Sequence, residues 1–200
     1  MKYLVLIMCF TLLGCTTAYG PNNLTGGYKE KKLDENSYIV SFFGNGYTSE
    51  QQVWNYWIYR CAELTIEKGF EVFSLDSSDK HAYYLHPGYD ELVEFKMLNT
   101  NSDGSENGVI PVQYYSYSVS TYSSKAIVNM YNIPIEEGVN VDILLDAESV
   151  IEQLQPYMDA KSKVSPPDRN NLYIRAAVEA AIKAKALDEE DAIRLRSTAI

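Results

Sequence analysis

The pattern that most constrains this fold is a capped helix between two short strands. Residues Ser37–Phe43 read SYIVSFF, a β-branched and aromatic run that stops at the glycines of Gly44–Gly46. Phe70–Leu75, which reads FEVFSL, is a second alternating run. The stretch between them has the periodicity of a helix. The succession strand, helix, strand predicts a βαβ unit.

The helix has clear start and stop signals. Ser49 and Gln52 have the spacing of a capping box, and Gly69 occupies the position where glycine ends helices. Between these ends the apolar residues recur at helical spacing, at Val53, Trp57, Cys61 and Leu64. We expect this stripe to face the core, and we interpret Cys61 as a buried, unreactive thiol.

Further strands follow in the middle of the chain. Glu91–Leu98 fits either a strand or a helical turn, but a polar loop separates it from the β-rich run 109–122, which favours hairpin partners. Lys125–Ile133 and Val139–Leu145 are further predicted strands. A helix then opens at Asp146 or Ala147 and is predicted to close at Pro156.

The composition shifts at residue 160. A proline-containing linker leads into an alanine-rich helix with Ile174, Val178 and Ile182 at successive turns. Residues 160–200 contain 8 basic and 6 acidic residues, whereas 15–159 contain 8 and 21. We therefore predict an α+β fold, in which a βαβ unit is extended by antiparallel strands into a mixed or antiparallel sheet, with two helices on one face and a C-terminal helical appendage.

Composition excludes several classes of protein. The chain of 200 residues has a formal net charge of -10, and its basic residues are not clustered, so it lacks the positive surface that nucleic-acid binding needs. Hydrophobic residues make up 46% of it, which is enough for a buried core. The three cysteines, Cys9, Cys15 and Cys61, match no disulfide, zinc or redox spacing.

The amino terminus has the features of a secretion signal. Lys2 precedes an apolar run from Tyr3 to Leu13 that is too short to span a bilayer. It ends in Leu12-Leu13-Gly14-Cys15, which resembles the bacterial lipobox, whose cysteine receives diacylglycerol before the signal peptide is cleaved. The resemblance implies a signal peptide at 1–14 and lipidation at Cys15.

The segment after Cys15 is polar and rich in Gly, Asn and Thr, so we expect a flexible tether at 15–33. An α/β domain at 34–159 would follow, and then the linker and C-terminal helices at 160–200. Thr16, which is not Asp, favours the outer membrane by resemblance to enterobacterial sorting rules.

Several short motifs follow one another in a fixed order in the first third of the chain. They are Gly27-Tyr28, Tyr38-Ile39-Val40-Ser41-Phe42, Gly44-Asn45-Gly46-Tyr47-Thr48, Arg60-Cys61-Ala62-Glu63-Leu64-Thr65 and Gly69-Phe70. Their succession resembles that of an uncharacterised family of bacterial envelope lipoproteins. The resemblance implies a location and a fold, and it supplies no catalytic residues.

Tyrosines provide the candidate interaction surface. The chain has 17 of them, and in QYYSYSVSTY the alternation predicts Tyr115 and Tyr117 on one face of a strand, with Tyr122 near its end. Packing under the helices is the other interpretation of these residues. His81 and His86 lack the spacing of metal ligands, so we expect no metal, cofactor or catalytic residues.

The sequence favours a lipid-anchored envelope lipoprotein that faces the periplasm and does no chemistry. Its expected partners are the membrane, through the lipid, and an envelope protein or peptidoglycan. An envelope-stress sensor and an enzyme acting on peptidoglycan or lipid are the alternatives, the second disfavoured because no catalytic constellation is evident.

Overall fold

The computed structural model describes residues 16–76, 83–96, 114–188, 191 and 193–195, with the backbone path alone for 83–96 and 114–120. In chain order its elements are β1 (Gly27–Lys32), β2 (Ser37–Phe43), α2 (Glu50–Glu67), β3 (Val72–Asp76), β4 (Tyr83–Lys96), β5 (Tyr114–Tyr131), η2 (Val141–Ile143), β6 (Leu145–Asp146), α3 (Ala147–Asp159) and α4 (Arg169–Lys183). None of the helices in these described parts has both the length and the apolar character needed to cross a membrane.

The long strand β5 organises the sheet. The strand order is β1-β2-β5-β3-β6, β4 also pairs with β5, and all these pairings are antiparallel. β2 and β3 therefore run parallel to each other on either side of β5. The predicted α+β class is confirmed, but the βαβ unit is split by β5 and the named strands form an antiparallel sheet. Local patterns could not predict the split, because the separating strand comes from much later in the chain.

The ends of α2 are those that the sequence predicts. Ser49 is the N-cap, and its hydroxyl accepts a hydrogen bond from the backbone N–H of Gln52 at 3.2 Å. At the other end Gly69 has φ +82°, and the N–H of Phe70 returns to the carbonyl of Thr65. This is a Schellman motif, in which a glycine in the left-handed region satisfies the last helical carbonyls.

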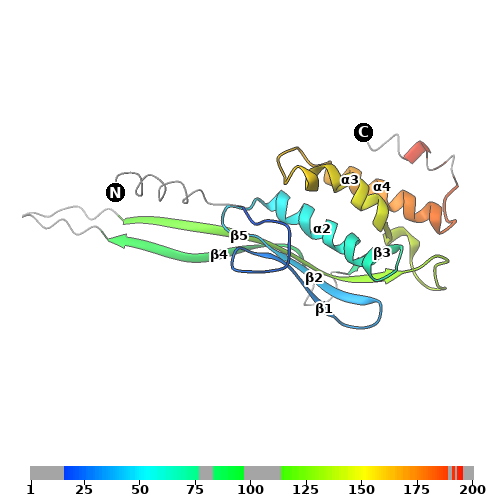
Figure 1. Cartoon of the computed structure of the whole chain (residues 1–200), viewed down its shortest axis with the longest axis horizontal. Helices are drawn as coiled ribbons and strands as arrows, with labels where there is room; N and C mark the ends of the chain where they lie inside the picture. Colours follow the sequence, from blue (N-terminus) through cyan, green and yellow to red (C-terminus); the bar gives the residue numbers. More distant parts are fainter. Residues whose placement is uncertain (1–15, 77–82, 97–113, 189–190, 192, 196–200) are drawn as a thin grey trace, which may run out of the picture.

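α2 is buried on more than its predicted stripe. It lies between the sheet and α3 (Figure 1), so side chains on both sides of it are covered. Trp57 donates a hydrogen bond to the carbonyl of Val40 in β2 at 3.0 Å, and Tyr59 donates one to Gln155 of α3 at 2.9 Å. Polar side chains are buried on this helix as well, namely Gln52, Asn55, Arg60 and Thr65.

The helix α3 begins as expected and ends later. Asp146 caps it by accepting a hydrogen bond from the N–H of Ser149 at 2.8 Å. The helix then continues past Pro156 to Asp159, so the predicted end at the proline is wrong. Pro156 has no N–H to donate to the preceding turn, but its carbonyl still accepts the N–H of Ala160 at 3.1 Å, so the helix continues for one more turn.

The last helix is part of the domain. The predicted C-terminal helix is present, and its Leu172 and Ala176 are fully buried in the main core, so it packs against the domain across the predicted boundary at residue 160. Ile174 is 38% exposed, so it does not lie on the buried face as predicted. Lys183 also forms an ion pair with Asp146, with Nζ and Oδ2 2.6 Å apart.

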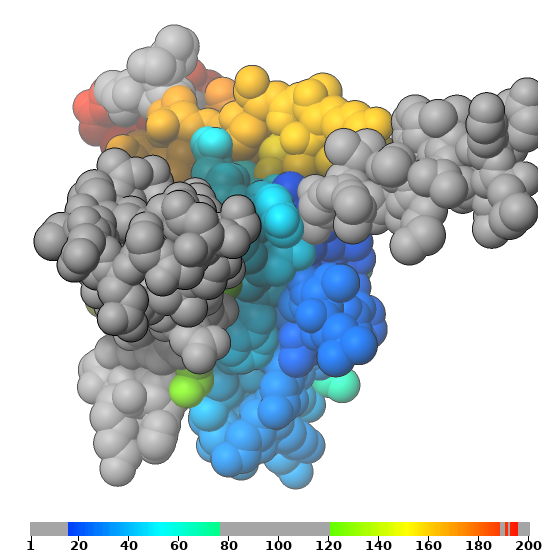
Figure 2. All heavy atoms as spheres, turned by 90° about the vertical axis from the view of Figure 1, so that its left-hand side faces the viewer, coloured from blue at the N-terminus to red at the C-terminus, as the bar shows by residue number. Residues whose placement is uncertain are grey.

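The amino-terminal segment is also structured. β1 pairs with β2 along its whole length, from Gly27 opposite Phe43 to Lys32 opposite Tyr38. Thr17 is only 1% exposed. Figure 2 shows this segment, in blue, packed against the body of the domain. The predicted flexible tether at 15–33 is therefore wrong for the described residues from 16 onward.

We predict that α4 contributes to the stability of the whole domain. Leu172→Ala removes a fully buried side chain and should lower the free energy of unfolding by about 2–5 kcal/mol, because it leaves a cavity in the core. Ile174→Ala on the same helix is the matched control and should lower it by less than about 1 kcal/mol. Urea denaturation of both variants checks this, and equal small losses would mean that α4 is an appendage after all.

Candidate functional site

A buried hydrogen-bond network holds the chain immediately after Cys15. The backbone N–H of Thr17 donates to the Thr48 hydroxyl at 2.8 Å, and the Thr17 hydroxyl donates to the carbonyl of Thr25 at 2.7 Å. The same hydroxyl accepts from the N–H of Asn45 at 2.9 Å. We call Thr17, Thr25, Asn45 and Thr48 the N-terminal lock. It joins the first described residues to the turn between β2 and α2.

The turn motif Gly44-Asn45-Gly46-Tyr47-Thr48 is built to make this lock. The Asn45 side-chain oxygen accepts from the N–H of Tyr47 at 3.0 Å and lies 2.9 Å from the Thr48 hydroxyl. A Cβ on Gly44 would lie 2.7 Å from Val53, so only glycine lets the turn approach the helix this closely. The motif therefore has a structural role, and it presents no phosphate-binding loop.

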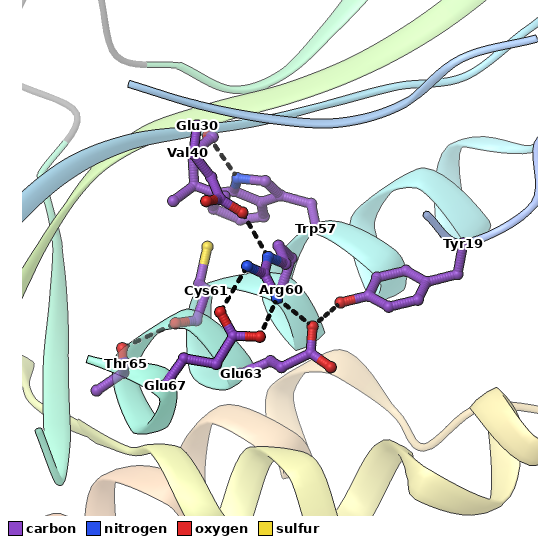
Figure 3. Close-up of polar contacts among 9 residues, drawn as sticks. All are labelled: Tyr19, Glu30, Val40, Trp57, Arg60, Cys61, Glu63, Thr65 and Glu67. Carbon is purple, nitrogen blue, oxygen red and sulfur yellow. Dashed lines mark hydrogen bonds and ion pairs between the residues drawn. The ribbon is translucent and has the colours of Figure 1, made fainter. Parts of the chain in front are cut away.

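A second cluster surrounds Arg60, which is buried on α2 (Figure 3). Its guanidinium pairs with Glu30 of β1 through Nε at 2.5 Å, with Glu63 through Nη1 at 2.5 Å, and with Glu67 through Nη2 at 2.8 Å. It also lies 4.5 Å from the centre of the Tyr28 ring. One cation thus connects the first strand to the central helix.

This cluster also reaches the amino-terminal segment. The Tyr19 hydroxyl donates to Glu63 at 2.5 Å, and its ring packs edge-on against those of Tyr56 and Tyr59. Tyr19, like Thr17, lies just after the predicted lipidation site. The N-terminal lock holds this short segment at Thr17, and the Arg60 cluster holds it at Tyr19.

The charges in the cluster are fixed near neutral pH. Burial alone favours a neutral guanidine, but the hydrogen bonds that Arg60 donates to Glu67, Glu30 and Glu63 outweigh it and raise the pKa of Arg60 above its ordinary value. Burial, followed by the hydrogen bond to Glu63, raises the pKa of Tyr19. The hydrogen bond from Arg60 lowers the pKa of Glu67. Groups held this firmly in one charge state are suited to holding elements together and poorly suited to proton transfer.

A hollow of about 450 Å³ opens beside the lock, between the amino-terminal segment, α2 and the end of α3. Tyr56 and Tyr59 line it, but their hydroxyls are already used. Tyr59 donates to Gln155, and Tyr56 shares a hydrogen bond of 2.5 Å with Ser162. Both of these tyrosine hydroxyls are thus committed to contacts within the protein.

The cysteine on α2 has the predicted environment. Cys61 is fully buried and unpaired, and burial raises the pKa of its thiol well above the ordinary value. A thiol of this kind is a poor nucleophile, because the thiolate is the reactive form. The expectation that Cys61 is buried is confirmed, and its lack of reactivity stays a prediction.

Most of the other candidate site residues, or their side chains, fall outside the description. Cys15 and His81 lie outside the described residues. Tyr115 and Tyr117 stand opposite Phe95 and Val93 in the pairing of β5 with β4, and their side chains are likewise outside the description. The described residues include no group of three or more His, Cys, Asp and Glu that could hold a metal ion.

Tyr122 differs from the other two tyrosines of the candidate surface. It is half-buried and packs against the main core. Its position has the opposite parity along β5, so it does not share a face with Tyr115 and Tyr117. Tyr122 therefore does not belong to the predicted surface, which leaves Tyr115 and Tyr117 as its candidates.

Sequence reasoning missed both polar networks. Glu63 and Glu67 lie three and seven residues after Arg60 on the helix, a spacing that indicates a shared face. Glu30 and Thr17 carry no such signal, since their partners are distant in the sequence. No family model matches the chain, and comparisons with curated proteins and with solved structures return no match. The function therefore has to be argued from the geometry.

We predict that the Arg60 cluster stabilises the fold in a pH-dependent way. Arg60→Met should lower the free energy of unfolding near pH 7 by about 2–4 kcal/mol, because three carboxylates lose their shared cation while remaining partly exposed. Arg194→Ala, at an exposed ion pair, is the control and should change it by less than about 0.5 kcal/mol.

The pH dependence follows from the lowered pKa of Glu67. A carboxyl whose pKa is lower in the folded state stabilises the fold above its unfolded pKa, and this contribution disappears as the pH falls through the folded value. The difference between wild type and Arg60→Met should therefore narrow below about pH 4. Urea denaturation across this range measures it, and a difference that widens in acid would contradict the assignment.

We also predict that the N-terminal lock is part of the folded domain. Thr17→Val removes the hydroxyl that donates to Thr25 and accepts from Asn45, and it should lower the free energy of unfolding by about 1–3 kcal/mol. Thr16→Val, at the exposed neighbour, should have an effect below about 0.5 kcal/mol. If the two variants unfold alike, the segment is a tether and not a part of the domain.

Proposed function

We propose that this protein is a lipid-anchored bacterial envelope lipoprotein, held at the outer membrane and facing the periplasm, where it serves as a non-catalytic binding or structural module. The observation that carries the proposal is the position of the N-terminal lock. Thr17 is buried and hydrogen-bonded two residues after Cys15, the cysteine of the lipobox-like motif.

The lock gives the anchor a consequence that the sequence alone does not suggest. A flexible tether of 18 residues, from Thr16 to Leu33, would let the domain move about 20–25 Å from the bilayer on average. With Thr17 fixed, the chain between it and Cys15 spans at most about 7 Å. An acylated Cys15 therefore holds the domain directly against the membrane, in an orientation set by the lock.

The energy of such an anchor is sufficient. Each buried CH₂ of an acyl chain contributes about 0.8 kcal/mol, and one chain alone binds only reversibly. The diacylglycerol that the lipobox resemblance implies for Cys15 supplies two chains, and two such signals together give stable attachment. The locked segment then converts this attachment into a defined position for the domain.

The non-catalytic part of the proposal rests on the chemistry of the described polar groups. Arg60 is saturated by carboxylates, Cys61 is buried as a thiol, and the tyrosine hydroxyls near the lock donate within the protein. Each of these groups supports the fold. A binding role at the surface does not require any of these groups to react.

The anchor is tested by metabolic labelling with radioactive palmitate. The wild type and Cys61→Ala should both incorporate label and sediment with the outer membrane, because Cys61 is buried and outside the lipobox-like motif. Cys15→Ala should incorporate none and leave the membrane fraction. Labelling that survives in Cys15→Ala, or is missing from the wild type, would overturn the proposal, whereas label in the inner-membrane fraction would overturn only the outer-membrane assignment.

A further inference from the structure

A two-stranded arm projects from the body of the domain (Figure 1). It consists of residues 87–96 of β4 and 114–122 of β5, which pair from Pro87 opposite Tyr122 to Lys96 opposite Tyr114. Only from Ser123 onward does β5 also pair with β2, and from Ile127 onward with β3. At about 3.3 Å per residue, the arm is about 30 Å long.

An arm of this kind lacks a source of stability of its own. A two-stranded ribbon in water is marginally stable at best, and three or more strands with an apolar face are needed for independent stability. By register, Tyr115 with Phe95 and Tyr117 with Val93 occupy one face of the ribbon. The arm therefore has the features of an incomplete sheet that further strands would stabilise.

The two edges of the arm differ in the way they are protected. The outer strand β4 contains Pro87, the charged residues Asp90, Glu91, Glu94 and Lys96, and two irregularities in its register. Proline, charges and bulges are the features by which natural sheets prevent an edge from pairing with another chain. This edge is therefore closed to further strands.

The opposite edge, on β5, has none of these features. Residues 107–124 contain no charged side chain, and residues 114–122 contain no proline. Among the described residues no strand pairs with this edge between Tyr114 and Thr121, and at Tyr122 its carbonyl accepts the N–H of Gly44. An uncharged, regular edge of this length is a template for another strand.

We propose that the β5 edge of the arm pairs with the same edge of a second copy of this chain, about a two-fold axis at Ser118. Antiparallel pairing about this axis places Ser116 opposite Ser120 and Tyr117 opposite Val119, so positions on one face meet positions on the same face. The four strands β4, β5 and their two symmetry mates then form one sheet.

Charge restricts the approach of a second copy to this edge. The chain has a net charge of -10, so two copies repel each other over most of their surface. The uncharged edge at 114–122 is where two identical edges approach without like charges facing each other. A two-fold axis also makes the contact close on itself, as most homo-oligomeric contacts do, instead of propagating into a fibre.

The geometry is also compatible with anchoring, although it does not depend on it. The base of the arm is joined to the N-terminal lock, since Gly44 contacts Tyr122 and the adjacent Asn45 contacts Thr17. A two-fold axis normal to the membrane places both locks on the same leaflet.

The pairing is tested by cysteine crosslinking in the full chain, expressed in cells and exposed to oxidant. Ser118→Cys should give a disulfide-linked species of twice the chain mass on a non-reducing gel, because the two Cα atoms across the axis lie within the roughly 4.4–6.8 Å that a disulfide spans. Glu94→Cys is the matched control. It stands opposite Ser116 on β4, three strand spacings from its mate, and should not crosslink.

The solution state supplies the second measurement. Wild type in detergent and the unacylated Cys15→Ala variant should both have twice the mass of one chain, so failure of the anchor and failure of the pairing are distinguishable. Ser118→Lys, which brings two charges together at the axis, should be monomeric and should keep a cooperative unfolding transition.

Three results would overturn the proposal. They are a monomeric wild type at all concentrations, a Ser118→Lys variant that remains dimeric, and a Ser118→Cys adduct whose mass is that of the chain plus a different protein. The last result would show that the edge pairs with a strand of another envelope protein.

Discussion

The structure depends on the burial of α2 on both of its sides. A helix that faces only a sheet can keep its polar side chains in solvent, but α2 also has α3 packed on its outer side. Arg60 of this helix is removed from water beside β1, where its guanidinium lies over the Tyr28 ring, and an unpaired buried cation is strongly destabilising. The three glutamates are the compensation. Because one of them, Glu30, belongs to β1, the central helix cannot be buried without the first strand in place.

Because β1 is required in this way, the amino-terminal segment has a structural role. Its composition is that of a linker, yet it supplies a carboxylate to Arg60, a ring to the tyrosine cluster and a hydroxyl to the lock. The segment that would connect a lipid to the domain is therefore one of the elements that hold the domain together. If Cys15 is acylated, the domain has no freedom to swing away from the bilayer, and its orientation there becomes a property of the fold.

The sequence predicted those parts of the fold whose signals are local. The bounds of β2, the cap at Ser49 and the glycine after α2 all depend on neighbouring residues, and all are confirmed. β1 was missed because its sequence, GYKEKK, buries one residue and exposes charged ones, as an edge strand does. On α4 the pattern of large apolar residues points to Val178, which is buried, but also to Ile174, which is exposed, and it passes over the buried Ala176 and Ala180 because alanine is a weak signal of burial.

The candidate site was harder to predict because it depends on contacts that are not local in the sequence. The contacts that bring the amino-terminal segment and β1 into it join residues distant in the sequence, such as Thr17 with Thr48 and Arg60 with Glu30. Only the glycine-containing turn between β2 and α2 could be recognised in advance, and it was interpreted as a turn alone.

That turn has a wider part in the architecture. Its first residue, Gly44, donates to Tyr122 at the base of the arm, and the next, Asn45, donates to Thr17 in the lock. A single short motif therefore fixes the direction in which the arm leaves the domain relative to the point where the chain would enter the membrane. Any partner that the arm binds is placed at a defined position relative to the anchor. In the positional role that we propose, this coupling is the property that the motif has to preserve.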